Sequence, residues 1–142
     1  MSTGEAPGGE VERAVEQANA ALYAAFESAD VDAMERAWDD VEPAAVVCVH
    51  PGWPMLRGRG SVLRSWSAVM AGTTYIQFFL TDVQVAVEGE TAVVTCTENV
   101  LTSADVGENA AVVATNVFRL RPDGWRVQVH HASPVLGRLV DG

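Results

Sequence analysis

The sequence of 142 residues contains no lysine, although it carries a formal charge of −10. Its nine cationic residues are all arginines and are scattered singly along the chain. Proteins that bind DNA, RNA or anionic membrane surfaces gather basic residues into a patch or stripe. We therefore expect no nucleic acid and no membrane surface among the partners of this protein.

Long hydrophobic runs are also missing. No run approaches the ~20 residues of a membrane-spanning helix, and residues 1–10 lack the basic and apolar regions of a secretory signal. Cysteine is scarce: Cys48 and Cys96 are the only two, without a C-x-x-C spacing. They indicate buried small hydrophobic side chains in a reducing compartment, with a disulfide as the alternative. These features favour a cytoplasmic protein.

A chain of this length suits one domain that buries a sizeable core without staples. Residues 1–9 have the composition of a linker, so we expect a disordered N-terminal tail. No Pro, Gly or Ser-rich linker divides the rest of the chain. The expected organisation is one domain over residues 10–137 and a short C-terminal tail over 138–142.

Apolar periodicity in the first half is helical. Apolar residues recur every three or four positions over 10–29, which predicts an amphipathic helix. Asp30 is a plausible N-cap for a second helix, which Pro43 stops. We expect a short strand over 44–50 and a third helix over about 61–71.

After Gly72 the apolar period changes to two and stays there. Tight turns are expected at 88–90 and 122–124. Helices first and a meander of antiparallel strands second is the pattern of an α+β fold. The predicted long strands are 75–88, 91–102, 110–121 and 125–132.

Both faces of these strands are largely apolar. Val112 and Phe118 alternate with Val113 and Val117, whereas a sheet covered on one face alternates with charge. Three helices can cover one face. A second copy of the chain is the economical cover for the other, so we expect a homodimer.

Five short phrases lie in order along the predicted elements: Phe26–Asp32, His50–Pro54, Leu56–Ser61, Ala114–Phe118 and Trp125–Pro134. Together with the element order, they resemble the SnoaL-like, or nuclear-transport-factor-two-like, family. The resemblance implies a cone, in which a bent sheet wraps around the first helix and leaves an apolar pocket at its open end. It fixes no reaction, because the fold hosts isomerases, cyclases, hydrolases, dehydratases and association domains.

The isomerases of that family place an acidic base at the end of the first strand, where this chain has His50. They place a protonated Asp on the third long strand, where it has Asn116. Their hydroxyl donor on the first helix falls at Leu22, beside Tyr23. These departures make steroid isomerase activity itself doubtful.

His50 and Asn116 are the candidate catalytic residues. A histidine at a pocket mouth can act as a general base, or it can be structural and bond a backbone or hydroxyl group. An amide on the apolar face of a strand needs a partner. Asn116 could bond an internal group such as His131, or it could donate to a ligand carbonyl.

Glu98, inside an apolar strand, would have a raised pKa, or would pair with an arginine. His130 and His131 must face opposite ways, and the strand alternation favours His131 as the inward one. A metal site from His50, Glu98 and His131 lacks any ligand spacing, so we expect neither a metal nor a cofactor. The candidate ligand-binding residues are Leu22, Tyr23, Phe26, Trp53, Cys96, Glu98, Phe118 and His131.

The leading hypothesis is therefore a homodimeric cone that binds a small, apolar, oxygen-bearing organic molecule without a cofactor. Proton transfer next to a carbonyl is the chemistry these residues allow, with His50 as base and Asn116 and Tyr23 as donors. The alternatives are an association module with a vestigial pocket and a carrier of hydrophobic molecules.

Overall fold

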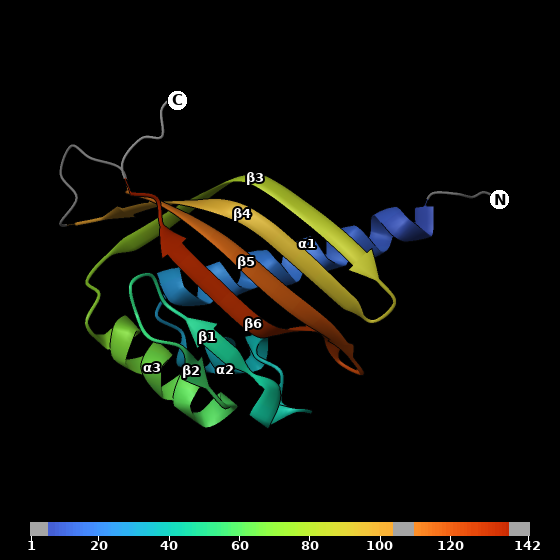
Figure 1. The fold of residues 1–142 in the computed structure, drawn as a ribbon, viewed down its shortest axis with the longest axis horizontal. Helices are drawn as coiled ribbons and strands as arrows, with labels where there is room; N and C mark the ends of the chain where they lie inside the picture. Colours follow the sequence, from blue (N-terminus) through green and yellow to red (C-terminus); the bar gives the residue numbers. More distant parts are fainter. Residues whose placement is uncertain (1–5, 104–109, 137–142) are drawn as a thin grey trace.

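The computed structural model describes residues 6–103 and 110–136, which form three helices and one curved sheet of six strands (Figure 1). The helices are α1 (Ala6–Glu27), α2 (Val31–Ala37) and α3 (Arg59–Ala71), with a 3-10 turn at Pro43–Ala45. The strands are β1 (Val47–Val49), β2 (Leu56–Arg57), β3 (Ile76–Glu88), β4 (Thr91–Thr102), β5 (Ala110–Arg121) and β6 (Gly124–Pro134).

The strand order in the sheet is β2-β1-β6-β5-β4-β3. Strand β1 pairs in parallel with β6, and the other neighbours are antiparallel. Helix α1 lies along the concave face, while α2 and α3 gather near β1 and β2 (Figure 1). The expected α+β class, the cone and the four long strands are confirmed, since three of those strands end within a residue of their predicted bounds.

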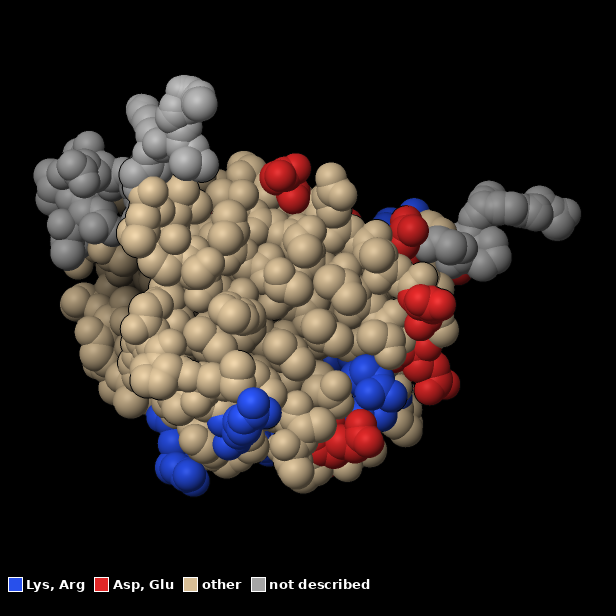
Figure 2. Space-filling model, viewed as in Figure 1, with Lys and Arg blue, Asp and Glu red and all other residues tan. Residues whose placement is uncertain are grey.

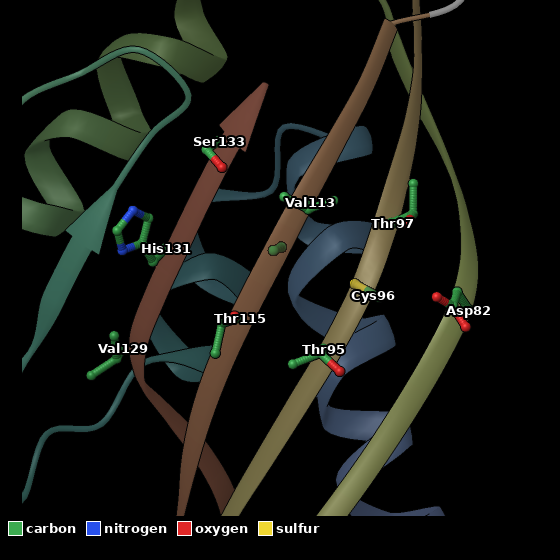
Figure 3. A pocket seen from close by; sticks show the side chains of 10 residues that line it. Asp82, Thr95, Cys96, Thr97, Val113, Thr115, Val129, His131 and Ser133 are labelled. Atoms are coloured by element: carbon green, nitrogen blue, oxygen red, sulfur yellow. The ribbon is translucent and has the colours of Figure 1, made fainter. Parts of the chain in front are cut away.

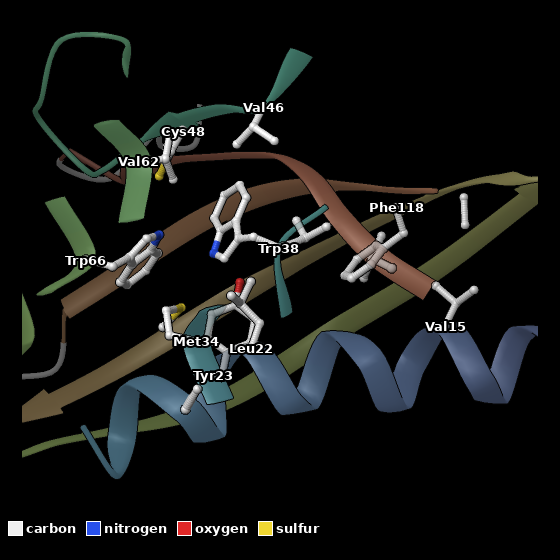
Figure 4. Close-up of a cluster of buried hydrophobic side chains, with 14 of the residues drawn as sticks. Val15, Leu22, Tyr23, Met34, Trp38, Val46, Cys48, Val62, Trp66 and Phe118 are labelled. Carbon is white, nitrogen blue, oxygen red and sulfur yellow. The ribbon is translucent and has the colours of Figure 1, made fainter. Parts of the chain in front are cut away.

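The core fills the space between the helices and the inner face of the sheet (Figure 4). Residues three or seven apart along α1 bury one face of that helix against alternate residues of the strands, as the two periodicities require. The largest fully buried apolar side chains are Trp38, Phe118, Leu22, Met34, Val15, Val46, Val62, Val94 and Val127.

Strand β6 contains a bulge that changes which of its residues face inward. Val117 of β5 pairs with Val129, but the next residue, Phe118, pairs with Val127, so Gln128 is one extra residue in β6. A bulge residue shifts the alternation of side chains by one position. Val127 is buried before the bulge, and after it His130 and Ala132 are buried instead.

Strand β3 has a second irregularity. Its register with β4 shifts between Thr81 and Gln84, and Asp82 there has a φ of 55°. The left-handed region is uncommon for a residue with a side chain, although Asp tolerates it better than most. The bulge adds to the local twist of the strand where the sheet curves around α1.

The helix boundaries differ from the expectation in two places. Helix α1 begins at Ala6, inside the expected tail, whereas residues 1–5 and 138–142 lie outside the described residues. Helix α2 ends at Ala37 and the chain forms a 3-10 turn at Pro43–Ala45, so the first strand starts only at Val47. The predicted cap is confirmed: the Asp30 side chain accepts a hydrogen bond from Ala33 N at 3.0 Å.

An ion pair fastens the segment after α2 to the sheet. The fully buried Asp39 carboxylate accepts two hydrogen bonds of 2.8 Å from the Arg121 guanidinium on β5. It also accepts bonds from the backbone N–H groups of Val41 and Glu42. Burial alone would raise the pKa of this carboxyl, but these bonds lower it to about 2.

Candidate functional site

A cavity of about 310 Å³ opens at one end of the cone, between α1, α3 and the sheet. We call it the cone pocket. Aromatic and aliphatic side chains make up most of its wall, and a few polar groups face it from α1, β4 and β6. The described residues that line it are Tyr23, Phe26, His50, Pro51, Trp53, Trp66, Val69, Thr73, Ile76, Phe78, Glu98, Val100, Thr102, Val112 and His130.

The aromatic rings of this wall pack edge to face. The ring centres of Tyr23 and Phe78 are 5.1 Å apart, as are those of Phe26 and Trp66. The ring centre of His50 lies 4.7 Å from the ring centres of both Trp53 and Trp66, and the ring planes are steeply inclined to each other. Edge-to-face packing of this kind is favourable between aromatic rings, and here it forms a continuous aromatic wall.

Asn116 is the centre of a buried hydrogen-bond network behind the cone pocket. Its Nδ2 donates to Asn19 Oδ1 at 2.8 Å and to Tyr23 Oη at 3.2 Å. Its Oδ1 accepts a bond of 2.5 Å from His130 Nδ1. The amide therefore joins α1 to β5 and β6, and it uses both of its N–H groups on protein partners.

Tyr23 and Glu98 form the polar end of the cone pocket. The Tyr23 hydroxyl donates to Glu98 Oε2 at 2.6 Å, and only 4% of Glu98 is exposed. Burial raises the pKa of the Glu98 carboxyl to about 7, although the bond from Tyr23 opposes the rise. Burial and the neighbouring carboxylate raise the pKa of Tyr23, which keeps its proton.

The two histidines at the cone pocket are neutral. Burial lowers the pKa of His50 to about 4, and burial together with the nearby His50 lowers that of His130 to about 3. His50 Nε2 lies 2.9 Å from Ser65 Oγ, which donates its own hydrogen to Val62 O at 2.6 Å. Ser65 must therefore accept from His50, whose proton is on Nε2.

Five of the expected site residues line the cone pocket: Tyr23, Phe26, His50, Trp53 and Glu98. Five others do not line it: Leu22, Cys96, Asn116, Phe118 and His131. Leu22 and Phe118 belong to the core. Cys96 is buried with its Sγ 3.9 Å from Tyr23 Oη.

Asn116 faces inward as expected, but it supports Tyr23 and His130 rather than lining the cavity. The expectation that it donates to a ligand does not fit the bonds it makes.

The expected orientation of the adjacent histidines was wrong. His131 is exposed on the outer face of the sheet, and His130 is the inward residue, with 3% of its surface exposed. The cause is the bulge at Gln128, which reverses the alternation carried forward from Val127.

Sequence reasoning missed His130 and Phe78 as lining residues. Trp66 packs in the core while one part of it lines the cavity. The regular alternation of β3 predicts one face for Phe78, but no periodic pattern separates a core position from a cavity wall.

A second hollow, of about 560 Å³, lies on the outer face of the sheet (Figure 3). Val113, Thr115, Val129 and His131 project into it from β5 and β6, and Asp82 stands at its edge on β3. We call this the outer hollow. Hydroxyl and aliphatic side chains dominate it, so it lacks the aromatic wall of the cone pocket.

Two features are absent from the described part of the chain. No group of three or more His, Cys, Asp or Glu side chains among the described residues is placed to hold a metal ion. None of the helices in residues 6–103 and 110–136 is long and apolar enough to cross a membrane.

A protein family and several solved structures match this chain over most of its length. The model of the SnoaL-like domain matches residues 15–137. A solved structure from Streptomyces avermitilis, provisionally assigned as a dehydratase of the nuclear-transport-factor-two-like family, is 51% identical. It superposes with a TM-score of 0.84 over 93% of this chain and 100% of that chain. No match was found among curated proteins.

Other solved structures carry different assignments. A protein from Thiobacillus denitrificans, provisionally assigned as a calcium/calmodulin-dependent protein kinase type II association domain, is 32% identical. It has a TM-score of 0.76 over 84% of this chain and 94% of that one. A provisional ketosteroid isomerase from Shewanella frigidimarina is 18% identical, with a TM-score of 0.72 over 87% and 97%. At that identity the likeness concerns the fold alone.

Proposed function

The chain belongs to the SnoaL-like domain family, and we propose that it binds a small, largely apolar, oxygen-bearing organic molecule in the cone pocket and moves a proton on it. The observation that carries this proposal is the buried Glu98 carboxyl. It lies at the end of an aromatic cavity, is held by Tyr23 at 2.6 Å, and has a pKa of about 7.

Glu98 is a better proton acceptor here than His50. A general base works best when its pKa lies near the working pH. The pKa of about 4 makes His50 a weak base, and its Nε2 proton is bonded to Ser65. In this proposal His50 contributes to the wall and orients a ligand, while Glu98 takes and returns the proton.

The simplest reaction of this kind acts on a carbonyl compound with an acidic C–H bond beside the carbonyl. The Glu98 carboxylate takes that proton, and the electrons of the C–H bond move into an enolate. Returning the proton at another carbon isomerises the substrate. If a hydroxyl group is lost from the β carbon while the C=C bond forms, the same proton goes to the leaving oxygen and water departs.

A related protein supports the dehydration route. The structure that is 51% identical is provisionally assigned as a dehydratase, and we extend that assignment to this chain as a proposal. Neither route uses a metal or a cofactor.

Deuterium exchange into an enolisable ketone tests the proposal. The probe is 2-tetralone in D₂O, followed by proton NMR at pD values from 5 to 9. We expect wild-type protein to exchange the proton next to the carbonyl at least tenfold faster than buffer, with a rate that rises through a pH of about 7. Glu98→Gln should return the rate to that of buffer.

His131→Gln is the matched control, because it changes a histidine on the other face of the sheet. It should leave the exchange rate unchanged. Equal rates for wild-type protein and Glu98→Gln would contradict the role of Glu98.

We also propose that the chain forms a homodimer through the outer face of the sheet. In the view of Figure 2, where the sheet lies in front of α1, this face is mostly uncharged and most charged residues lie toward its margins. Val113 is 45% exposed near its middle. A cytoplasmic location belongs to the same proposal, because Cys48 and Cys96 are free and buried.

An association module is the second candidate. It is favoured by the apolar outer face and by the 32% identical relative, which is provisionally assigned as an association domain. In that case the cone pocket would bind no ligand, and neither 2-tetralone nor any other aromatic probe would change the behaviour of the protein.

A further inference from the structure

The hydrogen-bond network restricts which chemical groups a ligand can use at the polar end of the cone pocket. Each N–H or O–H group can donate only as many bonds as it has hydrogens. Asn116 uses both of its hydrogens, on Asn19 Oδ1 and Tyr23 Oη. Tyr23, which accepts one of them, uses its single hydrogen on Glu98 Oε2.

His130 is fixed as an acceptor by the same network. Asn116 Oδ1 can only accept, so the hydrogen of the 2.5 Å contact belongs to His130 Nδ1. A neutral imidazole carries one hydrogen, and therefore Nε2 presents a lone pair. Within residues 6–103 and 110–136, His130 Nε2 makes no hydrogen bond, and the side chain lines the cavity although 97% of its surface is buried.

Glu98, when it is ionised, presents a second acceptor. Tyr23 occupies its Oε2, while no group in the described part of the chain bonds Oε1. Both Glu98 and His130 line the cone pocket and are almost fully buried. Because both residues line the cavity, a ligand atom or a bound water that carries a hydrogen can bond these two acceptors.

The charge of the wall adds a restriction. None of the described residues that line the cone pocket is an arginine, and the chain contains no lysine. Glu98 is the one lining residue among them that can carry a charge near neutral pH, and that charge is negative. A carboxylate or phosphate on the ligand would enter this wall without a cation to pair with it.

We infer that the cone pocket prefers a neutral hydroxylated ligand, whose hydroxyl hydrogen is accepted by His130 Nε2 or by Glu98 Oε1, over an anion or a molecule with acceptors only. The inference rests on the proposed function, because it concerns the same pocket. It reverses the expected chemistry of Asn116 and Tyr23, since both hydrogens that were expected to meet a ligand carbonyl are already used.

Three aryl probes of similar size separate these classes: 2-naphthol, 2-methoxynaphthalene and 2-naphthoate, titrated by calorimetry at pH 7.5. We expect 2-naphthol to bind at least tenfold more tightly than its methyl ether, and 2-naphthoate to bind most weakly. The preference for 2-naphthol should rise between pH 6 and 8, because an ionised Glu98 accepts from the hydroxyl and burial places its pKa at about 7.

His130→Gln and His131→Gln are a matched pair of variants on opposite faces of one strand. At pH 6, where Glu98 mostly holds its own proton, the preference of 2-naphthol over its methyl ether should shrink to less than threefold in His130→Gln and persist in His131→Gln. If His130→Gln does not fold, Glu98→Gln serves instead and should abolish the pH dependence of 2-naphthol binding.

Nitrogen NMR of the wild-type protein gives an independent readout. We expect His130 to carry its proton on Nδ1 and to lack one on Nε2 throughout pH 5 to 8. A proton on Nε2, or equal affinities for 2-naphthol and 2-methoxynaphthalene, would overturn this inference and leave the proposed function standing. If all three probes fail to bind at millimolar concentration and 2-tetralone shows no exchange above that in buffer, the proposed function fails with it.

Discussion

At the scale of single residues, Asn116 holds two of the lining residues, Tyr23 and His130, in place, although it does not line the cavity itself. Its amide makes three hydrogen bonds to Asn19, Tyr23 and His130, and none of its surface is exposed. Removing such a group leaves its buried partners unsatisfied, at a cost of about 1–3 kcal/mol each. The network thus makes the positions of Tyr23 and His130 depend on one side chain.

We expect Asn116→Leu, which keeps the size of the side chain, to lower the free energy of unfolding by about 3 kcal/mol. Urea unfolding measures the loss. The double variant Asn19→Leu/Asn116→Leu should recover part of it, since it removes a donor and its acceptor together. A loss of less than about 0.5 kcal/mol in Asn116→Leu would show that the network does not stabilise the fold.

Glu98 makes the stability of the protein depend on pH. Burial raises its pKa from 4.5 to about 7, so between these values the folded chain holds a proton that the unfolded chain releases. The contribution of Glu98 to the free energy of unfolding is complete below pH 4.5 and is lost as the pH rises through 7. Between pH 5 and 8, we therefore expect the free energy of unfolding of Glu98→Gln to rise by up to roughly 3 kcal/mol relative to that of the wild type.

Urea unfolding at several pH values checks this dependence. Glu88→Gln, at an exposed position at the end of β3, is the control and should follow the wild type at every pH. Parallel curves for wild type and Glu98→Gln would mean that Glu98 has an ordinary pKa, and the proposed base would then lose its support.

At the scale of secondary structure, alternation predicts inward residues well until a bulge interrupts it. The pattern placed Asn116 and Glu98 on the inner face, and both are buried there. It failed for His130 and His131, because Gln128 adds one residue to β6 and no turn residue or glycine marks the position. The short strand β2 was not predicted for another reason: two residues are too few to show an alternating pattern.

Local sequence also cannot give the packing between elements, and the Asp39–Arg121 pair is an example. We expect Arg121→Met to lower the free energy of unfolding by about 3 kcal/mol, because it leaves a buried carboxylate without its cation. Thermal and urea unfolding measure the effect. Asp39→Asn/Arg121→Met should be more stable than Arg121→Met.

Arg119→Met is the control for this pair, because the exposed contact between Arg119 and Glu42 is 3.5 Å long. Its removal should cost less than about 1 kcal/mol. Equal losses in Arg119→Met and Arg121→Met would show that burial of the Asp39 carboxylate does not decide the energy.

At the scale of the whole molecule, the two faces of the curved sheet border separate hollows. The inner face covers α1 and ends in the cone pocket, while the outer face presents aliphatic and hydroxyl side chains around the outer hollow. A variant of the outer face can therefore test assembly without touching the residues of the cone pocket. This separation makes the two halves of the proposed function independent.

We expect light scattering at micromolar concentration to give twice the chain mass of 15.1 kDa for the wild type. Val113→Arg should give the single-chain mass, because an unpaired charge would be buried in the middle of the proposed interface. Val41→Arg is the control and should remain dimeric, because it changes a residue that is 54% exposed in the segment after α2.

If Val113→Arg still binds 2-naphthol as the wild type does, the cone pocket is complete within one chain. A wild-type monomer would instead leave the outer face without its proposed partner.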